Sequence, residues 1–418
     1  MLIEIRVKNC YVFSNEVKLS LKADMRNKKF SSNVYRENDF NILKVAGIYG
    51  SNNVGKTGLI KCIRAIKNLL SHEDINVAPN IFSDSSICEL GIIFLENGRK
   101  FEYSFKYDAD KKEYPYEKFT EIKRDKYGNE TENVYLVRDV IEKEYFCHDE
   151  ELKKMLPVIS KNNILIFLID SDSFREVDEM KDILTSFAGK IDVVDMNNIP
   201  MNKTIELMKN KNNLQKKVVD FIKNADLYME NFVYSDIGQM DFEATVSKEG
   251  KPEEKVLDIP EKIMDQIRLT SVYKGIPVPS LLFDSTGTKK IAALASYIVQ
   301  AIQEGRILIV DELDSSIHFK LTRAIVAMFN NELNTNAQLL FTVHDINLMD
   351  CQRLFRKEQI WFIHKDDLGV YVYSLANFTA AEGIRDTSDI IEKYRKGALG
   401  ALPEPELINS LLEIKGNK

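Results

Sequence analysis

Residues 50–57 form a complete phosphate-binding loop. They read Gly50-Ser51-Asn52-Asn53-Val54-Gly55-Lys56-Thr57, which is the pattern G-x-x-x-x-G-K-T. An apolar run (42–49) precedes the loop, and apolar residues at helical spacing follow it, which predicts a strand, the loop and a helix in that order. The helical spacing is that of Leu59, Ile60, Ile63, Ile66 and Leu70. A chance turn before an ordinary helix rarely carries every fixed residue, so the octet indicates a nucleoside triphosphate site.

The chemistry expected of the loop follows from its residue types. Glycines allow the tight turn in which several backbone N–H groups point at one phosphate chain. Lys56 is expected to neutralise the β- and γ-phosphates, and the Thr57 hydroxyl to bind Mg²⁺. The helix that begins here adds its positive end to the same site.

A second cluster of polar residues lies near residue 311. Residues 306–312 form an apolar run that ends in Asp311 and Glu312, a pattern typical of a buried parallel strand whose end meets the ligand. Asp311 is expected to hold Mg²⁺, directly or through water. Glu312 is expected to orient and deprotonate the attacking water. A strand that runs into an acidic turn would look the same, and the upstream phosphate loop favours the catalytic interpretation.

Three more segments contribute candidate residues to the expected site. Residues 339–344 predict a strand that ends in His344, placed to sense the γ-phosphate, although a lone histidine is normally a capping or packing residue. Residues 284–288 (Asp-Ser-Thr-Gly-Thr) precede a helical stretch that starts near Lys289. Ser285 fits an ordinary N-cap or a phosphate contact at the helix start. Residues 314–316 (Asp-Ser-Ser) fit either a helix cap or a contact across a subunit boundary.

Composition limits the possible partners and compartments. The chain has 418 residues and a net charge of −7, so DNA contact would require a local basic patch. Its apolar stretches are too short and polar to span a bilayer, and charges are frequent before residue 20, where a signal peptide would lie. Five scattered cysteines without a C-x-x-C pair indicate reduced thiols. We therefore expect a cytoplasmic protein with no membrane partner.

The chain divides into two sequence types. Period-two alternation predicts strands at 2–7 and 17–21. Two further strand-like segments, 89–95 and 101–107, are joined by the turn residues Glu96-Asn97-Gly98, which predicts a hairpin. From about residue 108, charged and turn-rich sequence leads into helical patterns, including a helix near 214–222. We expect one nucleotide-binding domain built from residues 1–108 and 266–418, with a mostly helical subdomain (109–265) inserted between them. The insert has no long heptad array, so a coiled-coil arm is not expected.

Together these segments resemble the ABC-type ATPases of the SMC, Rad50 and RecF kind. More closely, the chain resembles the compact AAA-type ATPases of bacterial abortive-infection and other anti-phage systems. The resemblance is carried by the phosphate loop, residues 284–288, Asp311-Glu312-Leu313-Asp314 and Thr342-Val343-His344. Residues 394–403 and Ala225-Asp226-Leu227 also resemble the anti-phage subgroup. The motifs cover both ends of the chain in the expected order, and the middle matches loosely.

The resemblance implies an α/β P-loop NTPase fold of the ABC/SMC-head type, with a mixed sheet flanked by helices. It also implies ATP and Mg²⁺ as cofactors, and a homodimer or higher oligomer that closes over ATP. One protomer would supply the phosphate loop, Asp311, Glu312 and His344, and its partner would supply Ser285 and Gly287. The chain has Asp284 where the subgroup more often has Glu, and residues 89–121 contain no convincing Q-loop glutamine. Tyr11 and Phe13 are candidates for contact with adenine.

Three functions fit these features. The first is a defence ATPase that senses infection and controls a separate effector, a toxin or a nuclease, because little sequence follows His344 beyond a helix expected at 404–414. The second is a RecF- or SMC-like DNA-repair or DNA-clamping ATPase, which needs a basic groove. The third is a scaffold that binds ATP without turnover, and Glu312 argues against it because a structural site needs no base.

Overall fold

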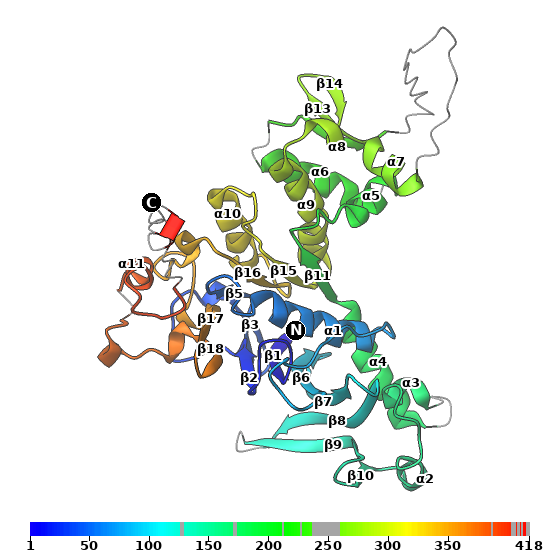
Figure 1. Ribbon diagram of the computed structural model, residues 1–418. Helices are drawn as coiled ribbons and strands as arrows, with labels where there is room; N and C mark the ends of the chain where they lie inside the picture. The colour runs from blue at the N-terminus through cyan, green and yellow to red at the C-terminus, as the bar shows by residue number, and fades with distance from the viewer. Residues whose placement is uncertain are drawn as a thin grey trace.

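The computed structural model describes residues 1–125, 129–169, 174–210, 213–225, 228–235, 260–385 and 388–402, together with 407, 410, 413 and 414. Two large sheets lie on either side of helix α1 (Lys56–Leu70), and a smaller sheet with its helices forms the lobe at the top of Figure 1. The helix is buried on most of its circumference, including Leu59, Ile63 and Ile66, so it forms the core that the two sheets share.

The six-stranded sheet positions the phosphate loop. Its first five strands run parallel, and the last is antiparallel to its neighbour. In spatial order the strands are β11 (Ile191–Asp195), β15 (Ile307–Asp311), β16 (Gln338–Thr342), β5 (Val45–Tyr49), β17 (Ile360–Asp366) and β18 (Gly369–Ser374). Because parallel strands end at the same edge, the segments after β5, β15 and β16 meet where ligands bind in such sheets.

The seven-stranded sheet is antiparallel throughout. In spatial order it contains β10 (Glu144–Cys147), β9 (Glu130–Asp139), β8 (Glu113–Arg124), β7 (Arg99–Asp108), β6 (Ile87–Glu96), β1 (Leu2–Lys8) and β2 (Val17–Ser20). The hairpin expected near residue 97 is confirmed: Asn97 and Gly98 both have positive φ, 50° and 72°, as the two-residue hairpin turn requires.

The upper lobe contains most of the helices from the middle of the chain. Its three-stranded sheet is built from β12 (Asn231–Tyr234), β13 (Leu269–Tyr273) and β14 (Ile276–Pro279). Its helices are α5 (Asn202–Lys209), α6 (Asn213–Asn224), α7 (Glu261–Arg268), α8 (Ser280–Phe283) and α9 (Thr286–Glu304). Buried Thr204 on α5 donates to the Ala292 carbonyl of α9 at 3.1 Å. Helix α9 leads directly into β15, so it connects the lobe to the six-stranded sheet.

The start of the expected insert differs from the prediction. Strands β8 to β10 extend the seven-stranded sheet, and β11 pairs with β15, so residues 113–195 contribute to both large sheets. The apolar alternation that would signal these strands is interrupted by a buried ion pair. Glu117 on β8 accepts a hydrogen bond from Arg138 on β9 at 2.5 Å, and both side chains are almost fully buried. The division of the chain into domains stays a prediction.

Further helices cover the sheets and lead to the carboxyl end. They are α2 (Glu150–Met155), α3 (Leu165–Leu168), α4 (Arg175–Gly189), α10 (Phe319–Asn330) and α11 (Ile390–Arg395), and a small hairpin pairs β3 (Val34–Glu37) with β4 (Phe40–Leu43). The helix expected at 404–414, Pro403 and the pair 226–227 lie outside the described residues, apart from 407, 410, 413 and 414. Within the described part of the chain, none of the helices has the length and apolar character needed to cross a membrane. All five cysteines are free and buried.

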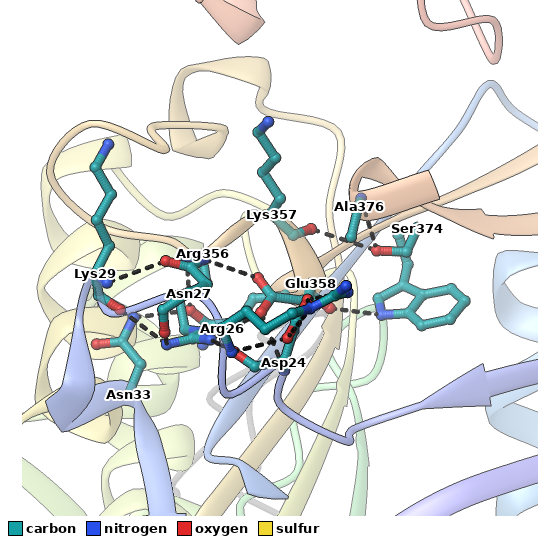
Figure 2. Close-up of polar contacts among 12 residues, drawn as sticks. Asp24, Arg26, Asn27, Lys29, Asn33, Arg356, Lys357, Glu358, Ser374 and Ala376 are labelled. Carbon is teal, nitrogen blue, oxygen red and sulfur yellow. Dashed lines mark hydrogen bonds and ion pairs between the residues drawn. The ribbon is translucent and has the colours of Figure 1, made fainter. Parts of the chain in front are cut away.

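A cluster of polar contacts around Arg356 fastens the first thirty residues to the second half of the chain (Figure 2). Arg356 is 2 % exposed and donates to the carbonyls of Asp24 at 2.6 Å, Asn27 at 3.1 Å and Lys29 at 2.8 Å. It also donates to the Glu358 carboxylate at 2.8 Å. The guanidinium therefore pairs three carbonyl groups of the loop at residues 24–29 and holds that loop against the second half of the chain.

Candidate functional site

The phosphate loop joins β5 to α1 in the arrangement expected from the sequence. Gly55 has φ 117°, and a Cβ added there would lie 2.5 Å from Val12 Cγ2. Asn53 also has positive φ, 61°. The Lys56 ammonium group donates to the carbonyls of Gly50 at 2.7 Å and Ser51 at 2.9 Å. The loop thus curls around the lysine, and only glycine fits at position 55 without strain.

A pocket of about 390 Å³ opens above this loop. It brings together most of the residues predicted for the site, from the loop and from the ends of β15 and β16. The lining residues are Tyr11, Val12, Ser51, Asn52, Asn53, Gly55, Lys56, Thr57, Gly58, Lys61, Glu312 and His344. Gly50 contributes its carbonyl to Lys56 beneath the pocket, and Val54 is buried in the core. Asp311 is buried behind Glu312, and Ser285 and Gly287 are not among the lining residues.

Lys56 has an unusual electrostatic environment. The side chain is only 7 % exposed, and this burial lowers its pKa, while the nearby carboxylates of Glu312, Asp311 and Asp314 oppose the shift. Burial removes water from the ammonium group and disfavours its charged form. A polyphosphate beside Lys56 would supply counter-charge to this ammonium group.

Asp311 and Glu312 are held at the end of β15 by Thr342, the last residue of β16. The Thr342 hydroxyl donates to Asp311 Oδ1 at 2.6 Å and accepts from the Glu312 N–H at 2.7 Å. Glu312 lines the pocket, as the sequence predicts for the base. The sequence assigns no role to Thr342, although a hydroxyl in the otherwise apolar run 339–343 is a signal for one.

Asp314 links the loops that follow β15 and β16. Its carboxylate accepts from the backbone N–H groups of His344 at 2.9 Å and Asp345 at 2.8 Å. Next to it, Ser315 accepts from Lys290 of α9 at 2.8 Å. Neither contact is a helix cap. Asp314 therefore fixes the backbone that carries His344 at the rim of the pocket.

Residues 284–288, the signature segment, form the start of α9. Ser285 is the N-cap, and its side chain accepts from the Thr288 N–H at 3.1 Å. Gly287 lies so close to the loop after β15 that an added Cβ would be 2.5 Å from the Ser316 carbonyl oxygen. The two preceding apolar side chains, Leu282 and Phe283, are 64 % and 67 % exposed. The N-terminus of α9 therefore lies next to two exposed apolar side chains, Leu282 and Phe283.

Asp284 faces the interior of the upper lobe. Its carboxylate accepts hydrogen bonds from the hydroxyls of Ser271 at 2.6 Å, Ser280 at 2.6 Å and Tyr273 at 2.8 Å. Three hydroxyl donors satisfy the buried charge. The carboxylate at this position therefore anchors the signature segment to β13, whereas Ser285 is exposed and Gly287 lies against the Ser316 carbonyl.

Tyr11 forms one wall of the pocket. Its backbone N–H donates to the Ala78 carbonyl and its hydroxyl to the Asn76 carbonyl, both at 2.9 Å. The Lys61 ammonium lies 5.6 Å from the centre of the Tyr11 ring. The other aromatic candidate, Phe13, is fully buried and packs under the phosphate loop. The residues that line the pocket include no glutamine, and the adenine contact stays a prediction for Tyr11.

The residues predicted for Mg²⁺ fit that ion. Thr57 begins α1 and lines the pocket, and the Asp311 carboxylate stands at the end of β15 with one oxygen used by Thr342. Hydroxyl and carboxylate oxygens are the ligands Mg²⁺ prefers, and it commonly takes only one or two protein ligands besides water and phosphate. Among the described residues there is no cluster of three or more His, Cys, Asp or Glu that would hold a metal without a nucleotide.

Comparisons with known proteins agree with this geometry. A family model described as "AAA domain, putative AbiEii toxin, Type IV TA system" matches residues 45–350. The chain belongs to this AAA-domain family. The matched region runs from β5 to beyond His344, so it contains the phosphate loop, the signature segment and the ends of β15 and β16. Together with the strand order, this confirms the predicted α/β fold of a P-loop NTPase with a mixed sheet flanked by helices.

The AAA domain also has distant structural neighbours. The SMC head domain from Thermotoga maritima is 12 % identical, with 89 % of this chain and 98 % of that chain covered and a TM-score of 0.40. An SmcHead bound to the C-winged helix domain of ScpA is 11 % identical, with coverage of 92 % and 99 % and a TM-score of 0.46. Among curated proteins there is no match.

Proposed function

We propose that this AAA domain binds ATP with Mg²⁺ in the pocket above the phosphate loop and hydrolyses it. The observation that supports this most is the meeting of Lys56, Thr57, Glu312 and His344 around one pocket, although they come from three separate strand ends. A site that bound ATP only as a structural ligand would not need a carboxylate such as Glu312 at the γ-phosphate end.

In this proposal each side chain has a separate task. Lys56 neutralises the β- and γ-phosphates, and the loop N–H groups hold the phosphate chain. Glu312 orients and deprotonates the water, and His344 contacts the γ-phosphate. Thr57 and Asp311 hold Mg²⁺, which neutralises charge that develops on the phosphate oxygens.

The proposed active form is a homodimer or a higher oligomer closed over ATP. Ser285 is exposed, and neither Ser285 nor Gly287 lines the pocket of its own chain, so a second copy is the natural source of this helix N-terminus at the γ-phosphate. A helix start attracts anions through its free N–H groups and its dipole. Closure would then depend on the γ-phosphate, which distinguishes ATP from ADP.

The proposed cellular role is anti-phage defence by abortive infection, in the cytoplasm. The family description names a toxin and a toxin–antitoxin system, and a system of that name has two components. We propose that the ATP-gated oligomer senses infection and controls a separate effector, a toxin or a nuclease. The DNA-clamping alternative has no specific support in the described contacts.

The biochemical test compares the purified wild type with Lys56→Ala and Glu312→Gln. We expect wild type to hydrolyse ATP, Lys56→Ala to lose nucleotide binding, and Glu312→Gln to bind ATP and form a stable dimer without turnover. The measurements are phosphate release, binding of a fluorescent ATP analogue, and mass by light scattering. A wild type without turnover, and a Glu312→Gln protein that stays monomeric with ATP, would refute the proposal.

A growth experiment tests the cellular role. The chain is expressed alone and with its neighbouring genes, with and without phage. Protection that needs both Glu312 and a second protein supports a separate effector. Growth arrest from the chain alone, dependent on Glu312, would show that the chain is itself the toxin. A gel shift of duplex DNA that strengthens with ATP and weakens steeply with salt would instead favour DNA clamping.

A further inference from the structure

Thr342 makes an unusual set of contacts for a residue in the middle of a sheet. It is fully buried at the end of β16, beside the end of β15. Its hydroxyl is 2.6 Å from Asp311 Oδ1 and 2.7 Å from the Glu312 nitrogen, and its carbonyl accepts from the Leu313 N–H at 3.1 Å. One residue thus contacts the predicted metal ligand, the predicted base and the residue that follows them.

The direction of these hydrogen bonds is fixed by chemistry. The backbone N–H of Glu312 can only donate, so the hydroxyl of Thr342 accepts there. The single hydroxyl proton is then available for Asp311 Oδ1, which must accept it. This hydrogen bond fixes the position of Oδ1 and so the orientation of the whole carboxylate. Thr342 therefore makes the Asp311 carboxylate a hydrogen-bond acceptor and fixes the rotation of this carboxylate.

Thr342 also controls the backbone of Glu312. Glu312 has φ 57°, in the left-handed region, which is unfavourable for a residue with a side chain. Such a conformation persists only when surrounding contacts enforce it. The Thr342 side chain and carbonyl bind the N–H groups of Glu312 and Leu313, and so they hold the turn that directs Glu312 into the pocket.

We propose that Thr342 is a positioning residue for the ATP hydrolysis proposed above. It acts through Asp311 and Glu312 and does not line the pocket itself. The inference rests on the proposed function, because the two residues that Thr342 holds are the proposed metal ligand and base. A purely structural threonine would contribute packing and stability without affecting the use of Mg²⁺.

Matched variants separate the hydroxyl from the packing. Thr342→Val keeps the shape and removes the hydroxyl, and Thr342→Ser keeps the hydroxyl and removes a methyl group. If Thr342→Val does not fold, Thr342→Ser and Thr342→Ala make the same comparison. The control is Thr322→Val on α10, because Thr322 is equally buried and its hydroxyl has no partner among the described residues.

The measurements are steady-state ATPase rates over a Mg²⁺ titration, and affinity for a fluorescent ATP analogue with Mg²⁺ and with EDTA. For Thr342→Val we expect kcat to fall about 10- to 100-fold, as for loss of a hydrogen bond to a charged group. We also expect half-maximal activity at about tenfold higher Mg²⁺, as for loss of a residue that orients a metal ligand, with affinity in EDTA unchanged within about twofold. Thr342→Ser should recover most of the rate, and Thr322→Val should match the wild type.

Two results would overturn the inference. One is a Thr342→Val enzyme with wild-type kcat and wild-type Mg²⁺ dependence. The other is a Thr342→Ser enzyme as defective as Thr342→Val, which would assign the effect to packing. If the wild type binds ATP but does not hydrolyse it, the proposed hydrolysis fails. The Mg²⁺-dependent gain in ATP affinity then tests separately whether Thr342 positions Asp311: a gain lost in Thr342→Val and kept in Thr342→Ser supports that positioning, and an equal gain in both refutes it.

Discussion

Replacing Gly55 by alanine tests whether the shape of the phosphate loop is set by its contact with residues 12–13. Gly55 has φ 117° and ψ 9° and precedes the first residue of α1. An added Cβ would lie 2.5 Å from Val12 Cγ2 and 3.1 Å from Phe13 Cζ. Phe13 is fully buried, so this wall cannot move away without disturbing the core.

The expected cost has two parts. The left-handed conformation costs an alanine about 1–2 kcal/mol. Forcing a methyl group into a packed site costs about 1–3 kcal/mol more. The sum predicts a loss of about 2–5 kcal/mol in the free energy of unfolding. Relief by movement of the loop would also shift Lys56, which follows directly, so affinity for ATP should fall as well.

The assay is urea unfolding without nucleotide, followed through the fluorescence of Trp361. This is the chain's single tryptophan, and it pairs with Ile48 in the six-stranded sheet. Gly275→Ala is the matched control, because Gly275 has φ 74° with nothing within 4 Å of the added Cβ. It should lose only the conformational part, about 1–2 kcal/mol. Gly189→Ala, at the end of α4 with open space around it, should be neutral or gain up to about 1 kcal/mol.

The comparison between Gly55→Ala and Gly275→Ala tests whether the contact with residues 12–13 constrains the phosphate loop. If Gly55→Ala costs no more than Gly275→Ala, the contact with residues 12–13 does not constrain the loop. Full ATP affinity in a Gly55→Ala protein would also contradict the reasoning, since the lysine would not depend on the conformation of residue 55.

Three further predictions concern assembly, acid stability and the contacts in Figure 2. Ser285→Arg should leave ATP binding by the monomer intact and abolish ATP-dependent assembly by light scattering; normal turnover in this variant would refute the trans contribution. Although burial opposes the shift, hydrogen bonds from Arg99 and Lys123 lower the pKa of Glu121 from 4.5 to about 2, so its stabilisation is present above pH 4.5 and lost as the pH falls towards 2. Glu121→Gln should therefore flatten the pH dependence of unfolding in that window, and an unchanged profile would contradict it. Arg356→Ala should cost about 1–3 kcal/mol in urea unfolding, because it removes the donor to three part-buried carbonyls and one of the donors to the Glu358 carboxylate; a loss below about 1 kcal/mol would show that water replaces the guanidinium.

The parts of the fold that could be predicted are those governed by neighbouring residues. The phosphate loop, the hairpin at Asn97-Gly98 and helix α1 each follow from local geometry. Ser285 is an N-cap for the same reason, since a hydroxyl before a helix satisfies a free N–H group. Family resemblance and strand order then agree on how Glu312 and His344 reach the same pocket.

The parts that could not be predicted depend on partners far away in the sequence. Strand β8 contains Glu117 and β9 contains Arg138. Charged residues usually lie on the surface, and the sequence does not show that these two form a buried ion pair with each other. Tyr11 reaches the pocket wall because its hydroxyl binds Asn76, a contact that no periodicity indicates. The role of Thr342 likewise requires that β16 lie beside β15, and pattern alone does not show which strands are adjacent.

The interleaved order of the six-stranded sheet has a consequence for synthesis of the protein. Strand β5 is translated early, but its two neighbours, β16 and β17, end at Thr342 and Asp366. At ordinary translation rates both edges of this apolar strand stay open on the ribosome for a time on the order of tens of seconds. Open edges invite wrong pairing, so nascent chains are expected to be clients of chaperones. ATP is expected to contribute little to the early folding of β5, because Glu312 and His344 of the nucleotide pocket are translated late.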